Sequence, residues 1–297
     1  MTAIEFSEVR RAYRKGADAL AGVTFAVAPG QVVGLVGKNG AGKTTLIRIA
    51  MGMLEAQSGT VRVLGLDPRA DAVAMKRRVG YVAEDQILPP YLKVGEVLDL
   101  HRELFPTWDE AAAADLLRRL ELGRGQRVGT LSKGQARRVA LLCAVAHRPE
   151  VLLLDEPASG LDPAARREFL EIAIRLLDES GCTILFSSHH MTDIERLADR
   201  IVMLHDGRVL LDHDLDRMRE GFSLALVPRA PGVTRERLLA VTGCLGVRER
   251  DAAFHAVLRL EPEPARLAVE RAVGVGGARC QSVTLEDLFV ELAGGQG

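Results

Sequence analysis

The segment GKNGAGKTT, residues 37–45, has the residue types of a loop that holds phosphate groups. It matches the pattern G-x-x-x-x-G-K-[ST], whose defined positions are here Gly37, Gly42, Lys43 and Thr44. Glycines let such a loop wrap around an oxyanion with its N–H groups pointing inward, and the following helix adds partial positive charge. The lysine of this pattern reaches the β- and γ-phosphates, and the hydroxyl suits Mg²⁺. The segment therefore predicts a nucleotide site, to which the loop also contributes Lys38, Asn39, Gly40, Ala41 and Thr45.

Two carboxylates end the apolar segment VLLLDEP, residues 151–157. Asp155 would hold the hydration shell of the metal, and Glu156 would polarise an attacking water. A strand that ends in acids is often only a solvated strand end, but ligands of parallel sheets bind at the carboxyl ends of strands. Together with the phosphate loop, the two acids favour a catalytic site.

A second possible anion site is LSKGQARR, residues 131–138. A hydroxyl and a glycine precede a helix rich in basic residues, and a helix start attracts anions. Taken alone, Ser132 is at least as well explained as an ordinary helix N-cap. The sequence thus offers two phosphate sites on either side of a long helical segment.

Hydrophobic periodicity predicts the elements that position these residues. The runs QVVGLVG, VLLLDEP and CTILFSSHH are typical of strands buried on both faces of a parallel sheet. A helix is expected from about Lys43 to Met53, and residues 93–148 have long helical periodicity. Within that segment, Asp109 is expected to be the N-cap of a helix. Its apolar stripe is Ala112, Leu116, Leu117 and Leu120.

The chain is expected to form two domains, 1–220 and 221–297. Before the boundary, RIVMLHDGRVLLDHD predicts a hairpin that turns at Asp206 and Gly207. After it, strand-like and helix-like segments alternate and suggest a small α+β unit. Its last helix has a capping-box-like start at Thr284 and Asp287. Its histidine, His255, and its cysteines stand alone, and packing is the expected role of each.

Composition narrows the classes of function that the sequence supports, without excluding nucleic-acid binding. The formal net charge of -1 gives no support to nucleic-acid binding. The four cysteines, Cys143, Cys182, Cys244 and Cys280, are widely spaced and form no metal-like pair. The first two lie in apolar runs and are expected to be reduced core residues. The charged start lacks the apolar centre of a signal peptide, and no apolar run reaches the ~18 residues of a membrane span.

Together these motifs resemble the nucleotide-binding subunit of an ATP-binding cassette (ABC) transporter, over about residues 3–218. The resemblance implies a P-loop NTPase fold of ABC type: a mixed α/β sheet, an N-terminal antiparallel β subdomain and a helical subdomain at about 93–148. LSKGQ is similar to the family's signature, LSGGQ, which contacts the γ-phosphate of ATP held by a second subunit. Ser132, Gly134 and Gln135 would then complete a neighbour's site, and two copies would form a head-to-tail homodimer. Lys133 replaces the usual second glycine.

Other positions match the family pattern. In SGLD, Asp162 resembles the loop residue at the subunit interface, although alone the segment could be any turn. His189 matches the switch histidine that contacts the γ-phosphate, whereas His190 has no role in the pattern and is expected to pack or to be exposed. Tyr13 matches an aromatic residue that stacks on adenine, unless it is an ordinary strand-edge tyrosine.

The segment GYVAEDQ, residues 80–86, departs from the pattern because Glu84 stands where the family has glutamine. Gln86 is the less favoured equivalent, since alignment on GYV puts Glu84 in register. A carboxylate there offers an oxygen to the metal but adds negative charge beside the phosphates. The next residues, Ile87–Leu92, form an apolar run. In the family this region docks a transmembrane subunit, although burial under the chain's own helices would also explain the run.

The resemblance implies an ATPase that uses ATP and Mg²⁺ and drives a separately encoded permease docked near Glu84–Leu92. The segments FPTWDE and SVTLEDLF favour the ABC-2-like, export-type subunits. Such a chain would be cytoplasmic and peripheral on the inner face of the membrane. The alternatives are a soluble ABC ATPase that acts on ribosomes, DNA or cofactor assembly, and a regulatory subunit with little hydrolysis. One cassette without a sustained heptad run disfavours the first alternative, and Glu156 with His189 disfavours the second.

Overall fold

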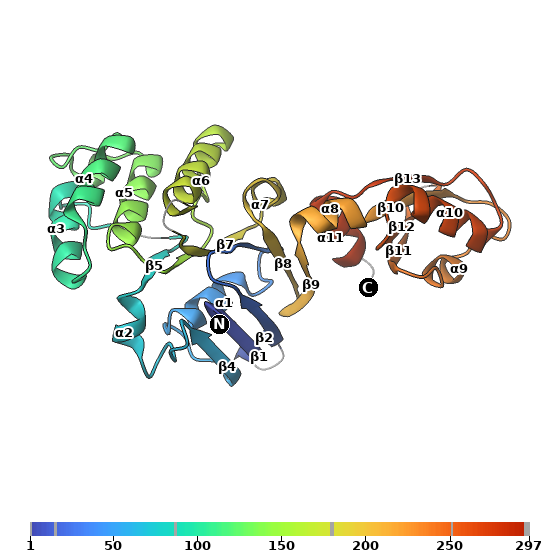
Figure 1. Ribbon diagram of the computed structural model, residues 1–297, viewed down its shortest axis with the longest axis horizontal. Helices are drawn as coiled ribbons and strands as arrows, with labels where there is room; N and C mark the ends of the chain where they lie inside the picture. Colours follow the sequence, from blue (N-terminus) through green and yellow to red (C-terminus); the bar gives the residue numbers. More distant parts are fainter. Residues whose placement is uncertain (1, 15–16, 86–87, 179–180, 251, 294–297) are drawn as a thin grey trace. The chain divides into compact units, whose positions relative to one another are not determined.

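The computed structural model describes residues 2–14, 17–85, 88–178, 181–250 and 252–293. The chain forms two compact units, Met1–Val209 and Leu210–Gly297 (Figure 1). The units therefore divide between residues 209 and 210 rather than between 220 and 221, where the composition changes.

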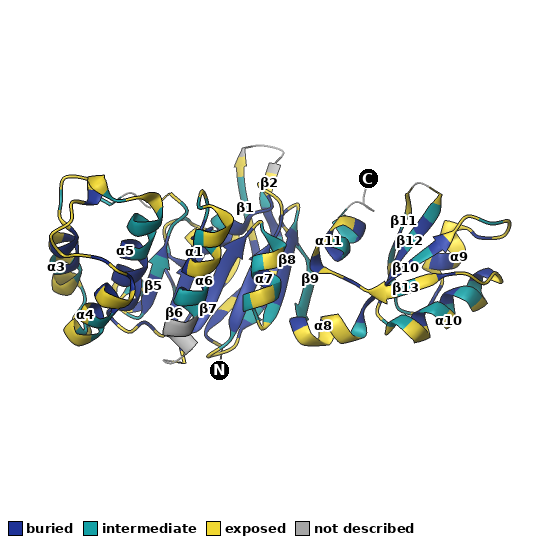
Figure 2. Ribbon diagram, turned by 90° about the horizontal axis from the view of Figure 1, so that it is seen from above, coloured by how far each residue is buried: buried dark blue, intermediate teal, exposed yellow. Residues whose placement is uncertain are grey.

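A six-stranded sheet has strand order β5-β6-β7-β3-β8-β9. Its first five strands belong to the first unit, and β9 spans the division between residues 209 and 210. Its strands are β3 (Val32–Val36), β5 (Val79–Val82), β6 (Val151–Leu154), β7 (Thr183–Ser188), β8 (Arg200–His205) and β9 (Arg208–Asp214). The first five strands in this order pair in parallel. Every residue of β3, β6 and β7 is buried, as their apolar runs predict (Figure 2). 

A smaller antiparallel sheet of order β2-β1-β4 belongs to the same unit. Its strands are β1 (Ile4–Arg14), β2 (Ala17–Val27) and β4 (Ser58–Val63). The rings of Phe6 and Phe25 lie 4.7 Å apart on its inner face. One apolar core joins this sheet to β3, β6, β7 and α1. The fold class expected from the sequence is confirmed, including the antiparallel β subdomain.

The helices of the first unit are α1 (Lys43–Ala50), α2 (Ala72–Lys76), α3 (Val94–Leu104), α4 (Glu110–Arg119), α5 (Lys133–Val145), α6 (Pro163–Asp178) and α7 (Met191–Leu197), with a 3₁₀ turn at Val128–Thr130. Helices α3, α4 and α5 pack together within the segment where periodicity predicts a helical subdomain (Figure 1). Asp109 is the N-cap of α4, as expected, and accepts a hydrogen bond from the Ala112 N–H. The buried stripe of α4 includes Ala113 rather than Ala112.

Of two turns in the first unit, the one after α1 comes earlier than the sequence predicts, and the one between β8 and β9 lies where it was expected. Helix α1 ends at Ala50, earlier than the expected Met53, because the chain turns at Gly52, where φ is 65°. The hairpin between β8 and β9 turns at Asp206 and Gly207, as expected. Both residues have positive φ, which is the conformation of a type I′ turn that suits twisted strands.

The second unit has its own sheet, of order β11-β12-β10-β13, in which every pairing is antiparallel. Its elements are α8 (Leu215–Gly221), β10 (Ser223–Pro228), α9 (Arg235–Leu239), β11 (Cys244–Arg250), β12 (Ala253–Leu258), α10 (Pro262–Val273), β13 (Arg279–Ser282) and α11 (Leu285–Ala293). The succession from β10 to β13 is the βαββαβ order of ferredoxin-like domains. A separate apolar core lies between this sheet and helices α9 and α10.

The last helix, α11, lies on the other face of that sheet. His255 of β12 is 3.5 Å from the buried Glu291 of α11, whereas its neighbours Phe254 and Ala256 belong to the core under α9 and α10. At the start of α11, the Thr284 hydroxyl accepts a hydrogen bond from the Asp287 N–H, as the capping pattern predicts.

Cys143 and Cys182 are buried free thiols, as expected. Burial raises the pKa of each to about 12, so neither is a reactive thiolate at neutral pH. Among the helices that the structure describes, none combines the length and the hydrophobicity of a membrane span.

Candidate active site

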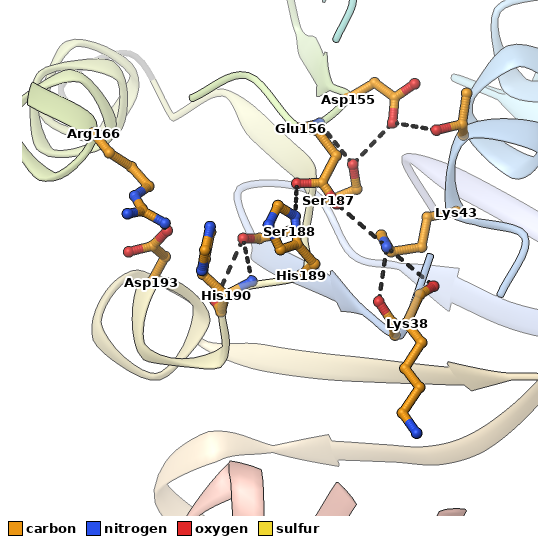
Figure 3. Close-up of polar contacts among 12 residues, drawn as sticks. Lys38, Lys43, Asp155, Glu156, Arg166, Ser187, Ser188, His189, His190 and Asp193 are labelled. Carbon is orange, nitrogen blue, oxygen red and sulfur yellow. Dashed lines mark hydrogen bonds and ion pairs between the residues drawn. The ribbon is translucent and has the colours of Figure 1, made fainter. Parts of the chain in front are cut away.

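The carboxyl ends of β3, β6 and β7 meet at one edge of the sheet. In the parallel register, Val36 pairs with Ser188, and Leu154 pairs with Phe186. The residues that follow these strands therefore lie side by side: the phosphate loop after β3, and the acidic pair after β6 (Figure 3).

The phosphate loop needs glycine at its junction with α1. Gly42 has φ 107°, and a Cβ atom there would lie 2.4 Å from the Ala19 carbonyl oxygen. The loop buries Gly37, Ala41, Gly42, Lys43 and Thr45, half-buries Thr44, and exposes Lys38, Asn39 and Gly40. The Lys43 ammonium donates a hydrogen bond to the Gly37 carbonyl at 2.8 Å, inside its own loop. Its charge also lies 3.2 Å from Glu156 Oε1, as an ion pair between two buried side chains.

Asp155 is tied to the phosphate loop through Thr44. The Thr44 hydroxyl donates to Asp155 Oδ1 at 3.0 Å, and the Ser187 hydroxyl donates to the same oxygen at 2.9 Å. Burial raises the pKa of Asp155, and these two hydrogen bonds oppose the rise. Among the described residues, Asp155 Oδ2 is buried and has no hydrogen-bond partner. A hydroxyl and a carboxylate oxygen at this distance fit a hard divalent cation such as Mg²⁺.

Ser187 was not singled out from the sequence. Besides binding Asp155, its hydroxyl accepts a hydrogen bond from the Glu156 backbone N–H at 2.8 Å. One side chain of β7 thus orders both acids of β6 (Figure 3). The signal was a hydroxyl in a strand buried on both faces, since a buried polar group requires a partner.

Glu156 and His189 form a hydrogen-bonded pair across the strand ends. His189 Nδ1 lies 2.8 Å from Glu156 Oε2. Because an ionised carboxylate only accepts hydrogen bonds, Nδ1 carries the proton and the other ring nitrogen is the one free to act elsewhere. Glu156 has φ 44°, a conformation that is uncommon outside glycine and occurs at functional sites. 

Tyr13 is brought to the phosphate loop by the antiparallel sheet. Its side chain is 57 % exposed, and its hydroxyl lies within hydrogen-bond distance of Thr45 Oγ1, at 3.1 Å. The exposed ring is held beside α1, and the Arg11 guanidinium carbon lies 5.6 Å from its centroid. Whether it stacks on adenine stays a prediction.

The signature-like residues lie elsewhere in the unit. Helix α5 packs against β5, and two strands separate β5 from β3 in the sheet. Ser132 caps α5 by accepting from the Gln135 N–H at 3.2 Å, and the Gln135 side chain accepts from the Ser132 N–H at 3.0 Å. Within one chain, Ser132 is therefore the N-cap that the sequence allowed, and it forms a capping box with Gln135. Gly134 faces Leu161, and Asp162 accepts from two N–H groups at the start of α6, which lower its pKa.

The loop that carries Glu84 is attached to the signature helix. Arg137 of α5 donates to the backbone carbonyls of Ala83 and Glu84. Burial raises the pKa of Glu84, and the negative charges of Glu156 and Asp155 raise it further. Arg137 was not singled out from the sequence, because its contacts depend on how α5 packs. Gln86 and Ile87 lie outside the described residues.

The apolar run after this loop is only partly covered. Tyr91 is 72 % exposed, while Leu88, Pro89 and Leu92 are half-buried and Pro90 is exposed. A separate cavity of about 870 Å³ lies near the amino ends of the strands, next to Arg78, Glu150 and Thr183. Because its position is opposite to the phosphate loop, this cavity takes no part in the site.

Comparisons with known proteins show the family to which this chain belongs. The model of the family described as ABC transporter matches residues 20–159. The Nod factor export ATP-binding protein I of Burkholderia orbicola is 33% identical over 304 residues, which cover 98% of this chain and 97% of that protein.

Two solved structures are similar to the first unit. One, described as the ATP binding subunit of an ABC transporter, has 31% identity and a TM-score of 0.66, and covers 73% of this chain and 92% of its own. The other is the dimeric bacterial ABC transporter cassette MJ0796, with 25% identity, a TM-score of 0.63, and coverage of 71% of this chain and 98% of its own. The chain therefore belongs to the ATP-binding proteins of ABC transporters and is an ABC-type ATPase.

Proposed function

We propose that two copies of this chain meet head to tail around two ATP molecules and drive a separately encoded transmembrane subunit. The observation that carries the proposal is the division of the phosphate-binding groups within one chain. Lys43, Asp155, Glu156 and His189 form one cluster, whereas Ser132 and Gly134 lie on α5, which packs against β5. A second copy would supply the missing half of each site, with Asp162 at the interface.

In each site, the phosphate loop from Gly37 to Thr45 would hold the triphosphate, and Tyr13 would stack on the base. When bound, Mg²⁺ would neutralise charge on the phosphates, held by Thr44 and Asp155 with Glu84 nearby. The described residues contain no cluster of three or more metal-binding side chains, so phosphate and water oxygens would complete its shell. Lys43, which bonds its own loop here, would turn its ammonium to the phosphates.

Glu156 would act as the base that orients and polarises the attacking water. Its carboxylate is held by Lys43 and His189, and its backbone by Ser187. His189 would donate a hydrogen bond from Nδ1 to Glu156 and present Nε2 to the γ-phosphate. Positioned charge of this kind is the main source of catalysis in phosphoryl transfer.

The membrane partner would dock near Glu84–Leu92. Tyr91 is exposed there, and Leu100 and Leu104 of the following helix are 50 % and 68 % exposed. An exposed apolar surface of this kind marks a partner site. The export function of the Burkholderia relative supports an exporter. Such a subunit would be cytoplasmic and peripheral on the inner face of the cell membrane.

The decisive experiment compares Glu156→Gln with Glu150→Gln. These two acids stand at opposite ends of β6, and Glu150 pairs with Arg78 far from the loop. Glu156→Gln should bind ATP, form a dimer in sizing and light-scattering experiments, and hydrolyse ATP at least about a hundredfold more slowly. Glu150→Gln should keep parental turnover.

Parental turnover in Glu156→Gln would remove this residue as the base. An ATP-loaded Glu156→Gln protein that stays strictly single-chain at high concentration, with and without the membrane partner, would overturn the head-to-tail arrangement.

A further inference from the structure

Three side chains beside Glu156 and His189 have no part in the function described so far. His190 follows the switch histidine, Arg166 belongs to α6, and Asp193 belongs to α7 (Figure 3). All three line one small pocket together with Glu156 and Ser159. The family pattern gives His190 no role, so its contacts must explain why it lies there.

The His190 ring packs directly against the ring of His189. The two ring centroids are 3.9 Å apart, at an angle of 42°. The backbone between them is also held, because the His190 N–H donates to the Ser188 hydroxyl at 3.0 Å. Burial lowers the pKa of His190, and the positive charges of His189 and Arg166 lower it further. His190 therefore places its ring against one side of the switch histidine.

On its other side, His190 is near an ion pair that joins two helices (Figure 3). Arg166 Nε and Asp193 Oδ2 are 3.9 Å apart, and the two side chains are only 14% and 16% exposed. Burial raises the pKa of Asp193, and the charge of Arg166 opposes that rise. Arg166 lies one turn after Asp162. The Asp162 carboxylate accepts hydrogen bonds from two N–H groups at the start of α6, the helix that also carries Arg166. The pair thus connects the start of α6 to the helix that follows His189.

We propose that His190 and the Arg166–Asp193 pair are positioning residues for His189 and fix the direction of its ring toward the γ-phosphate. The inference rests on the proposed roles of Glu156 and His189. Among the described residues, the 2.8 Å contact of Nδ1 with Glu156 is the hydrogen bond that ties the His189 ring to the site, and this side chain is 37% exposed. A single hydrogen bond leaves a ring free to tilt, whereas a neighbouring ring in direct contact restricts the tilt. Small misplacements of a catalytic group are costly in rate.

The arrangement also has a consequence for a dimer. Asp162 caps α6 and would lie at the subunit interface, so movement of this helix start would shift Arg166. The ion pair would pass that shift to α7 and thus to His190 and His189. The switch histidine would take its working orientation only when α6 is correctly placed.

The first test is a set of His190 variants in the full-length protein. His190→Ala should lower kcat for ATP hydrolysis about tenfold and leave KM for ATP within about twofold, because the loss concerns orientation and not binding. His190→Phe restores a flat ring and should recover most of the lost kcat. The matched control is His213→Ala, which removes another histidine in ring contact, edge-on to Phe222 with the centroids 5.0 Å apart, and should change neither constant.

The second test concerns the two helices. Arg166→Ala should lower kcat in the same way, whereas Arg196→Ala should not. Arg196 also joins α7 to α6, through Glu171 at 2.6 Å, but it does not line the pocket beside His190. The imidazole ¹⁵N signals of His189, assigned with His189→Ala, should shift in His190→Ala and in Arg166→Ala but stay in place in Arg196→Ala.

The outcomes separate this inference from the proposed function. If His189→Ala hydrolyses ATP at the parental rate, the proposed role of His189 fails and the inference fails with it. If His189→Ala is impaired but His190→Ala and Arg166→Ala keep parental kcat and unchanged His189 signals, only the inference is overturned. A loss of kcat in His190→Ala that His190→Phe does not recover would also overturn the inference, because contact of a ring with His189 would then not be what supports kcat.

Discussion

Ser187 shows how a single residue can hold a site together. Its hydroxyl donates to Asp155 and accepts from the Glu156 backbone, so it fills both of its hydrogen-bonding roles inside the acidic pair. Glu84, in contrast, adds negative charge to the site instead of hydrogen bonds. Burial and the charges of Glu156 and Asp155 raise its pKa. The balance of charge in the site therefore depends on the residue at position 84.

We predict that Glu84→Gln keeps nucleotide binding and changes the Mg²⁺ dependence of turnover. Loss of one negative charge near the metal site should weaken Mg²⁺ binding, with a half-saturating concentration about two- to fivefold higher. Steady-state ATPase assays over a Mg²⁺ titration measure this shift. Asp85→Asn removes the same charge from the neighbouring exposed residue and should move the curve less. Superimposable titrations for Glu84→Gln and the parent would argue against any contact of Glu84 with the metal site.

Helix α5 is the element that connects the separate parts of the first unit. Its first residues carry the signature-like cap, Arg137 holds the loop of Glu84, and its end leads into His147. His147 is 1% exposed and stacks on Phe105, with ring centroids 4.1 Å apart. Burial lowers the pKa of His147 to about 4, so this packing requires a neutral imidazole.

The packing of His147 predicts a pH dependence of stability. The unfolded chain takes up a proton on this histidine near pH 6.5, whereas the folded chain does so only near pH 4. Protonation therefore favours unfolding as the pH falls from 6.5 toward 4, by roughly 1.4 kcal/mol per pH unit. Denaturant unfolding of the parent and of His147→Phe at pH 7, 6 and 5 should show a shallower decline for the variant. If the free energy of unfolding declines equally in both proteins as the pH falls, protonation of His147 is not the cause of the decline.

The whole molecule combines a catalytic unit with a ferredoxin-like unit that has its own core. All the residues of the proposed site lie before residue 209, from Tyr13 to His189. The second unit offers no catalytic motif. We propose that it either strengthens the homodimer or regulates the ATPase through a partner.

Truncation after Gly221 tests the role of the second unit. The shortened chain keeps all of β9 and α8, so it should unfold cooperatively and hydrolyse ATP, because no residue of the site is removed. Sizing of an ATP-loaded Glu156→Gln form, with ATPase assays of the active form, separates the two hypotheses. A weaker dimer supports the first, and altered turnover with an unchanged dimer supports the second. If neither property changes, both hypotheses fail.

The local sequence was sufficient for the parts of the fold and site that depend on short-range chemistry. Continuous apolar runs indicated the buried parallel strands. The phosphate loop needs a positive φ at its junction with α1, and the sequence has glycine there, at position 42. The caps at Asp109 and Thr284 followed from hydrogen bonds over three residues, and the turn at Asp206 and Gly207 followed from residue types that tolerate a positive φ. The family resemblance indicated which residues belong to the nucleotide site.

Contacts between distant segments were decided only by the tertiary structure. Ser187 meets Asp155 because β6 and β7 are neighbours in the sheet, although 32 residues separate them in the chain. Arg137 reaches the loop of Glu84 because α5 packs against β5. His190 acquires its surroundings because α6 and α7 bring Arg166 and Asp193 together. Local periodicity contains no information on which strands pair or which helix faces meet, so these partners depend on the packing of the whole unit.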